Sequence, residues 1–170
     1  MTHIKRIDEM DNRLATKYHN SRDIAFANKI ISLVKEVLKH EHISPERLDK
    51  LHTAILDNVD VAKKISTAKF PAVGPVNEYM PHQTESSTIE LNSDEKLICE
   101  TTKTYNTTSR YAGFRGQTSY EYRIYLQDSY TRSGKSIGNS YYSKASITSS
   151  DPNAAKNECR MEALIKYFKI

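Results

Sequence analysis

Basic and tyrosine side chains are concentrated in the C-terminal half of this 170-residue chain. Residues 101–150 contain seven Lys or Arg against two Asp or Glu, and eight of the eleven Tyr lie between Tyr105 and Tyr142. Guanidinium and ammonium groups neutralise phosphates, and tyrosine rings stack on unpaired bases. This composition favours binding of nucleic acid or a nucleotide. The candidate ligand-binding residues are Arg110, Arg115, Arg123, Tyr125, Arg132, Lys135, Tyr142 and Lys144.

Other chemically capable residues do not complete a catalytic or metal-binding motif. Residues 133–136 (SGKS) are similar to the end of a phosphate-binding P-loop, but the first glycine of that motif is absent and a strand is expected to follow. The histidines of residues 40–52 lack the ligand spacing of a metal site. Cys99 and Cys159 are too few for a disulfide framework. We therefore expect a protein that is not an enzyme and holds no cofactor or metal.

The positive charge is unevenly distributed along the chain. Residues 1–96 contain fourteen Lys or Arg against fifteen Asp or Glu, whereas residues 97–170 contain eleven against six. The whole chain carries a formal net charge of +4. Such a shift in charge indicates two regions with different structures and different roles.

Helical periodicity predominates in the first region. Apolar residues recur at intervals of three and four, a spacing that lines one side of a helix. The two clearest stripes are Ile24, Ala27, Ile31, Val34 and Leu38, and then Leu48, Leu51, Ile55, Val59 and Ala62. Asn20-Ser21 and Ser44-Pro45 are typical helix starts. A helical hairpin or a three-helix unit is expected over residues 1–66.

The helical stripes leave two alternatives open for their partner. They are similar to coiled-coil stripes but span only about two heptads each. A homodimer through helices 21–40 and 45–66 is one expectation, and packing within the same chain is the other. Residues 67–87 contain three prolines and a glycine, so they are expected to form a linker or an arm that covers its own chain or a neighbour.

Strand-like alternation marks the second region. Residues 97–105, 118–131 and 138–148 are rich in Thr, Tyr and Ile, and a further short strand is expected at residues 89–91. Asp151-Pro152 then opens a final helix. We therefore predict an α+β fold: the N-terminal helices, an antiparallel meander of three to four strands, and a closing C-terminal helix. Residues 88–170 form the β-β-β-α domain of this organisation.

Period-two alternation assigns the strand residues to two faces. Tyr120, Tyr122, Ile124 and Leu126 are expected to face the core, together with Tyr141 on the last strand. On the opposite, solvent-exposed face the alternation places the side chains of Arg123, Tyr125, Tyr142 and Lys144. These four residues would form the centre of the basic, tyrosine-rich surface.

The stretch from Tyr120 to Phe168 resembles the second part of a double-stranded-RNA-binding domain, a three-stranded sheet followed by a helix. Residues 155–164 (AKNECRMEAL) are similar to the closing helix of that family, although its paired phosphate-binding lysines fall on Pro152 and Asn153 here. The same stretch resembles small α-β-α sandwich domains of bacteriophage proteins. These resemblances imply RNA binding and a phage or mobile-element origin, respectively.

The sequence thus predicts a non-enzymatic binding protein with a nucleic-acid or nucleotide ligand. The alternative is an oligomeric protein-interaction or virion-assembly protein without such a ligand. No apolar run approaches the roughly 20 residues of a membrane helix, and the N-terminus lacks the apolar stretch of a signal peptide. A cytoplasmic location, in the host cell if the protein is viral, and no membrane partner are expected.

Overall fold

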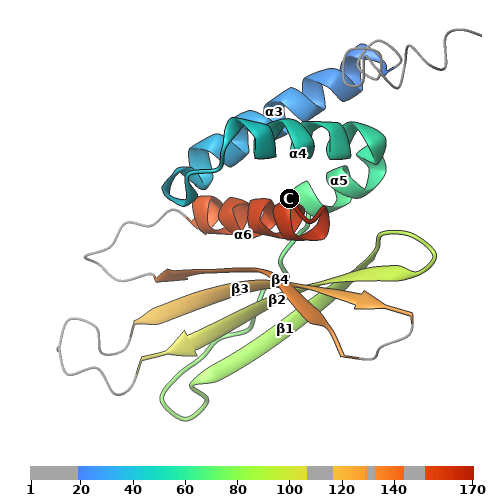
Figure 1. Ribbon diagram of the computed structural model, residues 1–170. Helices are drawn as coiled ribbons and strands as arrows, with labels where there is room; N and C mark the ends of the chain where they lie inside the picture. The colour runs from blue at the N-terminus through green and yellow to red at the C-terminus, as the bar shows by residue number, and fades with distance from the viewer. Residues whose placement is uncertain (1–18, 107–116, 130–132, 144–151) are drawn as a thin grey trace, which may run out of the picture.

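A computed structural model describes residues 19–106, 117–129, 133–143 and 152–170. It confirms an α+β fold in which helices cover one face of a four-stranded antiparallel sheet (Figure 1). The C-terminal helix lies directly on the sheet, and the N-terminal helices lie on top of it. Residues 1–18, the start of the helical region predicted over residues 1–66, lie outside the described residues.

Helix α3 spans Ser21–Val37 and begins where the sequence indicated. The side chain of Asn20 accepts a hydrogen bond of 2.8 Å from the backbone N–H of Asp23, which caps the first turn. The helix ends at Leu38, and the short 3-10 helix η1, Lys39–Glu41, leads to His42 in the left-handed conformation. The chain then turns back along α3.

The predicted helix over residues 45–66 is two helices. Helix α4 spans Pro45–Asp57 and is capped by the Ser44 hydroxyl, and helix α5 spans Val59–Ser66. Between them Asn58 leaves the helical conformation, with φ −148° and ψ 65°. The uninterrupted helical periodicity could not reveal this break, because apolar spacing continues through Asn58 and only packing requires the change of direction.

The apolar stripes of these helices are buried within the chain itself. Ala27, Ile30, Val34 and Leu38 of the α3 region share one core with Leu51 and Ile55 of α4 and Ile65 of α5. Helices α3 and α5 also pack on the C-terminal helix α6, Pro152–Tyr167. The stripes predicted to hold a second copy therefore have an intramolecular partner, and the homodimer stays a prediction without structural support.

The strands form one sheet in the order β1-β2-β3-β4, in which each strand pairs antiparallel with the next in the chain. Strand β1 spans His82–Glu90, β2 Glu95–Tyr105, β3 Thr118–Asp128 and β4 Lys135–Ser143. The predicted meander is confirmed, but β1 begins well inside the segment assigned to a linker. Ser and Thr dominate β1, so its apolar alternation was too weak to predict the strand.

The remaining arm, residues 67–81, packs on its own chain. The backbone carbonyl of Ala68 accepts a 2.8 Å hydrogen bond from Arg160 Nε of α6, and the Ser87 hydroxyl donates to the carbonyl of Lys69. Further along, the Gln83 side-chain amide donates to the Pro75 carbonyl. The arm thus runs alongside β1 on the side of the sheet that carries the helices.

Alternation along β2 and β3 follows the prediction. Leu97, Cys99 and Thr101 of β2 and Tyr122 and Ile124 of β3 are buried against the helices. The intervening residues lie on the other side of the sheet, which we call the distal face.

A β-bulge inverts the expected faces of β4. Ile124 pairs with Gly138, but Tyr125 pairs with Ser136, so Ile137 has no partner in the ladder. The extra residue shifts the alternation by one position. Tyr142 therefore packs on the helix side, whereas Tyr141 lies on the distal face and is 75% exposed. The predicted placement of these two tyrosines was wrong for this reason.

Helix α6, Pro152–Tyr167, lies between the sheet and the other helices and is buried on two sides. Its buried residues are Ala155, Cys159, Met161, Ala163, Leu164 and Ile165. Ala154, in the first turn of the helix, is exposed. Among the helices that the structure describes, none combines the length and apolarity needed to cross a bilayer.

Glu162 of α6 should make stability depend on pH. Its side chain accepts a 3.3 Å hydrogen bond from the Asn139 N–H, yet burial raises its pKa above the ordinary value of 4.5. A carboxyl whose pKa is raised by folding favours the folded state below its unfolded pKa, and this contribution is lost as the pH rises through the folded pKa. We expect Glu162→Gln to melt at a higher temperature than the wild type at pH 7.

Thermal melting between pH 3.5 and 8 tests this expectation, with the exposed Glu36→Gln as the control. The advantage of Glu162→Gln should shrink toward pH 4, where the wild-type carboxyl is itself protonated. A constant difference across this range would contradict the proposed role of burial.

Candidate nucleic-acid interface

Four of the eight residues predicted to bind a ligand lie among the described residues, and of these the structure brings only Arg123 and Tyr125 together. Arg123 and Tyr125 lie on the distal face, Tyr142 lies on the helix side, and Lys135 begins β4 beside the end of α6. Arg110, Arg115, Arg132 and Lys144 lie outside the described residues. The predicted surface is therefore not continuous in this part of the chain.

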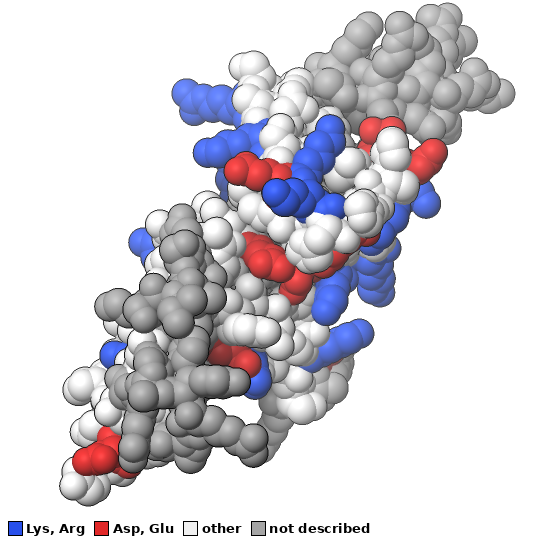
Figure 2. All heavy atoms as spheres, turned by 90° about the vertical axis from the view of Figure 1, so that its left-hand side faces the viewer, with Lys and Arg blue, Asp and Glu red and all other residues white. Residues whose placement is uncertain are grey.

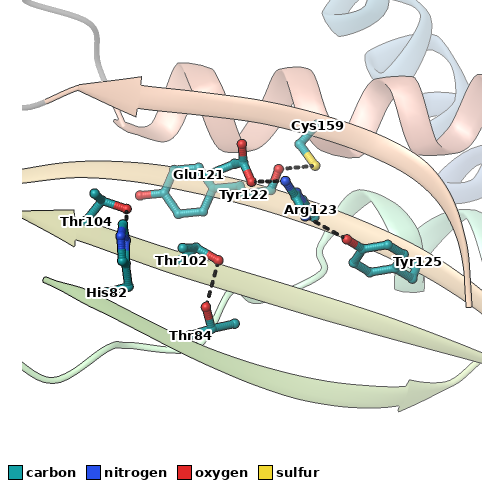
Figure 3. Close-up of polar contacts among 9 residues, drawn as sticks. All are labelled: His82, Thr84, Thr102, Thr104, Glu121, Tyr122, Arg123, Tyr125 and Cys159. Carbon is teal, nitrogen blue, oxygen red and sulfur yellow. Dashed lines mark hydrogen bonds and ion pairs between the residues drawn. The ribbon is translucent and has the colours of Figure 1, made fainter. Parts of the chain in front are cut away.

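Arg123 is held by neighbours on the distal face. It forms an ion pair with Glu121, and its Nη1 donates a 3.2 Å hydrogen bond to the Tyr125 hydroxyl (Figure 3). This hydrogen bond, more than the nearby carboxylates, raises the pKa of Arg123, so the group stays charged. The register also places Glu100 opposite Arg123 on β2. Local carboxylates thus neutralise the cation chosen from the sequence.

The rest of the distal face is polar rather than basic. Polar side chains form hydrogen bonds across the first two strands. The hydroxyls of Thr84 and Thr102 are 3.0 Å apart, and the Thr104 hydroxyl is 3.2 Å from His82 Nδ1 (Figure 3). Over the described residues the face carries Glu90, Glu100 and Glu121 against Lys96 and Arg123. A phosphate backbone would meet no excess of positive charge there.

Tyrosine rings gather instead on the helix side, near the end of the sheet where β4 stops. The rings of Tyr120 and Tyr142, from paired strands, have centroids 6.2 Å apart, and the rings of Tyr120 and Tyr122 stack at 6.4 Å. Phe70 of the arm packs on Tyr122 at 5.0 Å. Such spacings are typical of favourable aromatic pairs.

Basic side chains lie over these rings. The ammonium group of Lys103 is 5.7 Å from the centroid of Tyr120, and that of Lys156 is 5.3 Å from the centroid of Tyr122. Both distances are within the range of cation–π attraction. Neither lysine has an ion-pair partner among the described residues. We call Lys103, Tyr120, Tyr122, Tyr142 and Lys156 the tyrosine–lysine cluster.

The base of the cluster is fixed by stacking and by hydrogen bonds. Arg160 stacks on Phe70 at 5.3 Å and also donates 2.9 Å and 2.8 Å hydrogen bonds to Asn157 and to the carbonyl of Ala68. Burial lowers the pKa of Arg160. Burial also raises the pKa of Tyr122 to about 12, so its hydroxyl is neutral at physiological pH. The outer rings, Tyr120 and Tyr142, are half-buried and each keeps a part of its surface in solvent.

The described residues form no broad basic surface on the side of the molecule shown in Figure 2. There Lys and Arg project mainly from the helical half, with Asp and Glu between them. Because the two signs are mixed over the helices, the unpaired lysines of the tyrosine–lysine cluster become the more distinctive feature.

Sequence reasoning selected only Tyr142 of the cluster as a ligand-binding residue. Tyr120 and Tyr122 fell on the predicted core face, and Lys103 was assigned to neither face. Lys156 fell in the helix after the predicted sheet. A usable signal existed, because the resemblance to the double-stranded-RNA-binding family drew attention to this helix. However, the contact of Lys156 with Tyr122 of β3 depends on how close α6 lies to the sheet, which the sequence does not show.

The cysteines and histidines do not form a second site in the described part of the chain. Cys99 and Cys159 are buried free thiols, and burial raises the pKa of both, that of Cys99 to about 11. The Cys159 thiol donates to the Tyr122 carbonyl at 3.6 Å (Figure 3). No three His, Cys, Asp or Glu side chains of the residues described could hold a metal together.

The segment similar to a P-loop continues directly into strand β4. A P-loop must be followed by a helix whose N-terminal amides hold phosphate. The strand expected to follow this segment is therefore confirmed.

Comparisons with known proteins found no relative of this chain. No protein-family model, curated protein or solved structure matches it. The resemblances to double-stranded-RNA-binding domains and to phage sandwich domains stay predictions.

Proposed function

We propose that the protein is a non-enzymatic binding protein whose tyrosine–lysine cluster takes single-stranded nucleic acid. The observation that carries the proposal is the coincidence of stacked, partly exposed rings with two unpaired ammonium groups. Bases stack on aromatic faces without regard to sequence, and lysines attract the phosphates between them. The base of the cluster, formed by Phe70 and Arg160, holds the rings in place before a ligand arrives, which lowers the cost of ordering them.

Binding of a fluorescein-labelled twelve-nucleotide oligouridine, followed by anisotropy, tests this proposal. Tyr142→Ala should weaken binding by roughly 5- to 150-fold, since one stacked base contributes about 1–3 kcal/mol. Tyr142→Phe keeps the ring and should bind like the wild type. A joint change of Lys103 and Lys156 to Gln should instead flatten the salt dependence by about 1.4 units of log Kd per log salt, because single strands release about 0.7 counterion per neutralised phosphate.

Matched controls come from the distal face. Arg123→Gln and Tyr125→Ala remove the residues that the sequence favoured, and we expect neither to change the affinity or the salt slope. Loss of binding in these two variants but not in the cluster variants would return the site to the distal face. Absence of binding by the wild type at 20 mM salt would refute nucleic-acid binding altogether.

A protein-interaction role is the second candidate, because large apolar side chains are exposed at the same end of the sheet. Tyr79 is 88% exposed and Met80 52% exposed in a turn of the arm, and Tyr141 is 75% exposed on β4. Solvent-exposed aromatic residues are enriched in protein interfaces. Light scattering at 10–200 μM tests self-association, and replacing both Tyr79 and Tyr141 by Ser should abolish it if these residues form the contact.

A further inference from the structure

A hollow of about 690 Å³ lies at the other end of the sheet, between the start of β4 and the last turn of α6. It is the size of pockets that take small organic ligands. Its lining comes from strands β2, β3 and β4 and from the end of α6 with the turn that follows it. The hollow is separate from the tyrosine–lysine cluster, so a ligand held here is independent of the function proposed for that cluster.

The rim of the hollow is positively charged. Lys135 approaches from β4, and Lys166 and Lys169 approach from the end of α6, all three exposed. One carboxylate, that of Glu95, also lines the hollow. Its Oε1 accepts hydrogen bonds from both the Tyr167 hydroxyl and the Asn92 amide, so that oxygen is already engaged. The side chains of the lining therefore carry an excess of two positive charges.

The floor of the hollow is apolar. Ile137 of β4 and Ile165 of α6 are buried beneath it, with 3% and 6% of their surfaces exposed, and Leu126 of β3 lies beside them. The Tyr167 ring forms one wall, and burial raises the pKa of its hydroxyl, so the ring stays neutral. An apolar floor under a cationic rim suits a ligand with an apolar body and an anionic end.

Lys169 reaches this rim from an unfavourable backbone conformation. Its φ is 57°, in the left-handed region that favours glycine. The turn is a Schellman-type helix end, in which the N–H of Ile170 donates to the Ile165 carbonyl and that of Lys169 to the Lys166 carbonyl. Glycine would serve this turn better, so Lys169 occupies this position at a cost in backbone strain.

We propose that this hollow binds a small amphipathic anion: an organic carboxylate, sulfonate or phosphate whose aliphatic or aromatic body lies on Leu126, Ile137 and Ile165. Lys135, Lys166 and Lys169 contact the anionic end. The chemistry needs no covalent step, and the ligand is held by apolar burial together with ion pairs at the rim.

Fluorescence titration with 1-anilinonaphthalene-8-sulfonate tests the proposal on the full chain. This probe has an aromatic body and one fixed negative charge, and N-phenyl-1-naphthylamine is its neutral counterpart. We expect one saturable site for the anion and much weaker binding of the neutral probe. A joint change of Lys135 and Lys166 to Gln should weaken the anion roughly 3- to 20-fold, the effect of removing two partly exposed ion pairs.

Three variants separate this site from structural effects. Lys169→Gly should weaken binding of the anion while raising or maintaining the melting temperature, which a merely structural residue would not do. The exposed Lys50→Gln of α4 and the joint Lys103 and Lys156 change should leave anion binding unchanged. Equal binding of the two probes, or an anion affinity insensitive to Lys135, Lys166 and Lys169, would overturn the proposal.

To distinguish the source of the negative charge, laurate and dodecyl phosphate compete with the bound probe in separate titrations. Displacement by both, and not by dodecanol, would support a site for amphipathic anions in general. Displacement by dodecanol at the same concentration would show that the rim charges contribute nothing.

Discussion

Replacing Val34 by Asp is expected to leave the chain unfolded at pH 7 and 25 °C. Val34 is fully buried between α3 and the other helices. A carboxyl in such a place has its pKa raised by about 3–5 units, which costs about 4–7 kcal/mol at neutral pH. Loss of the valine side chain adds about 1.5–3 kcal/mol. The sum approaches or exceeds the roughly 5–15 kcal/mol by which a domain of this size is stable.

Circular dichroism and light scattering, measured on the same sample, check this result. Ser32→Asp, on the exposed side of the same helix, is the control and should change stability by less than about 0.5 kcal/mol. A Val34→Asp chain that stays folded but has half the wild-type mass would show instead that the stripe binds a second copy. That outcome would restore the homodimer predicted from the sequence.

Gly138→Ala should destabilise the protein by about 3 kcal/mol, at the upper end of the usual cost of overpacking. A Cβ atom at Gly138 would lie 2.4 Å from the Cys159 carbonyl oxygen and 3.2 Å from Ala163 Cβ. The first of these contacts is with the backbone of α6, which cannot rotate away as a side chain could. The helix must therefore move off the sheet, or β4 must bend.

Gly74→Ala is the matched control for this change. Its added Cβ would come within 2.9 Å of Gln83 Oε1, which is the far end of a flexible side chain. Chemical denaturation of the two variants should therefore give a loss below about 1 kcal/mol for Gly74→Ala. Equal stability of Gly138→Ala and the wild type would mean that α6 does not lie as close to β4 as the structure places it.

Local signals in the sequence were sufficient for much of the fold. The caps at Asn20 and Ser44 and the proline at residue 45 act within one helical turn, so they are readable from neighbouring residues. The alternation in β3 is equally local, because one side of the sheet is buried throughout. These features were sufficient to predict the helices, the meander and the closing helix.

Other features depended on packing between distant segments. The break at Asn58 allows α5 to reach α6, and no residue near Asn58 requires it. Strand β1 has little apolar alternation of its own. It is held in place by pairing with β2 and by the arm, residues 67–81, which runs alongside it. Intramolecular burial of the helical stripes likewise depends on α6, which lies about a hundred residues later in the chain.

The candidate site shows the same division most clearly. Composition by itself determined that basic and tyrosine residues are abundant in the second half of the chain. Which of Tyr141 and Tyr142 meets Tyr120 was decided by one unpaired residue, Ile137, because a bulge there exchanges the faces of these two tyrosines. Period-two reasoning has no means of placing a bulge, since the bulge forms where Gly138 lets α6 approach the sheet. The sequence therefore supplied the residue types, and tertiary packing placed Tyr142 in one cluster with Lys103 and Lys156, apart from Arg123 and Tyr125.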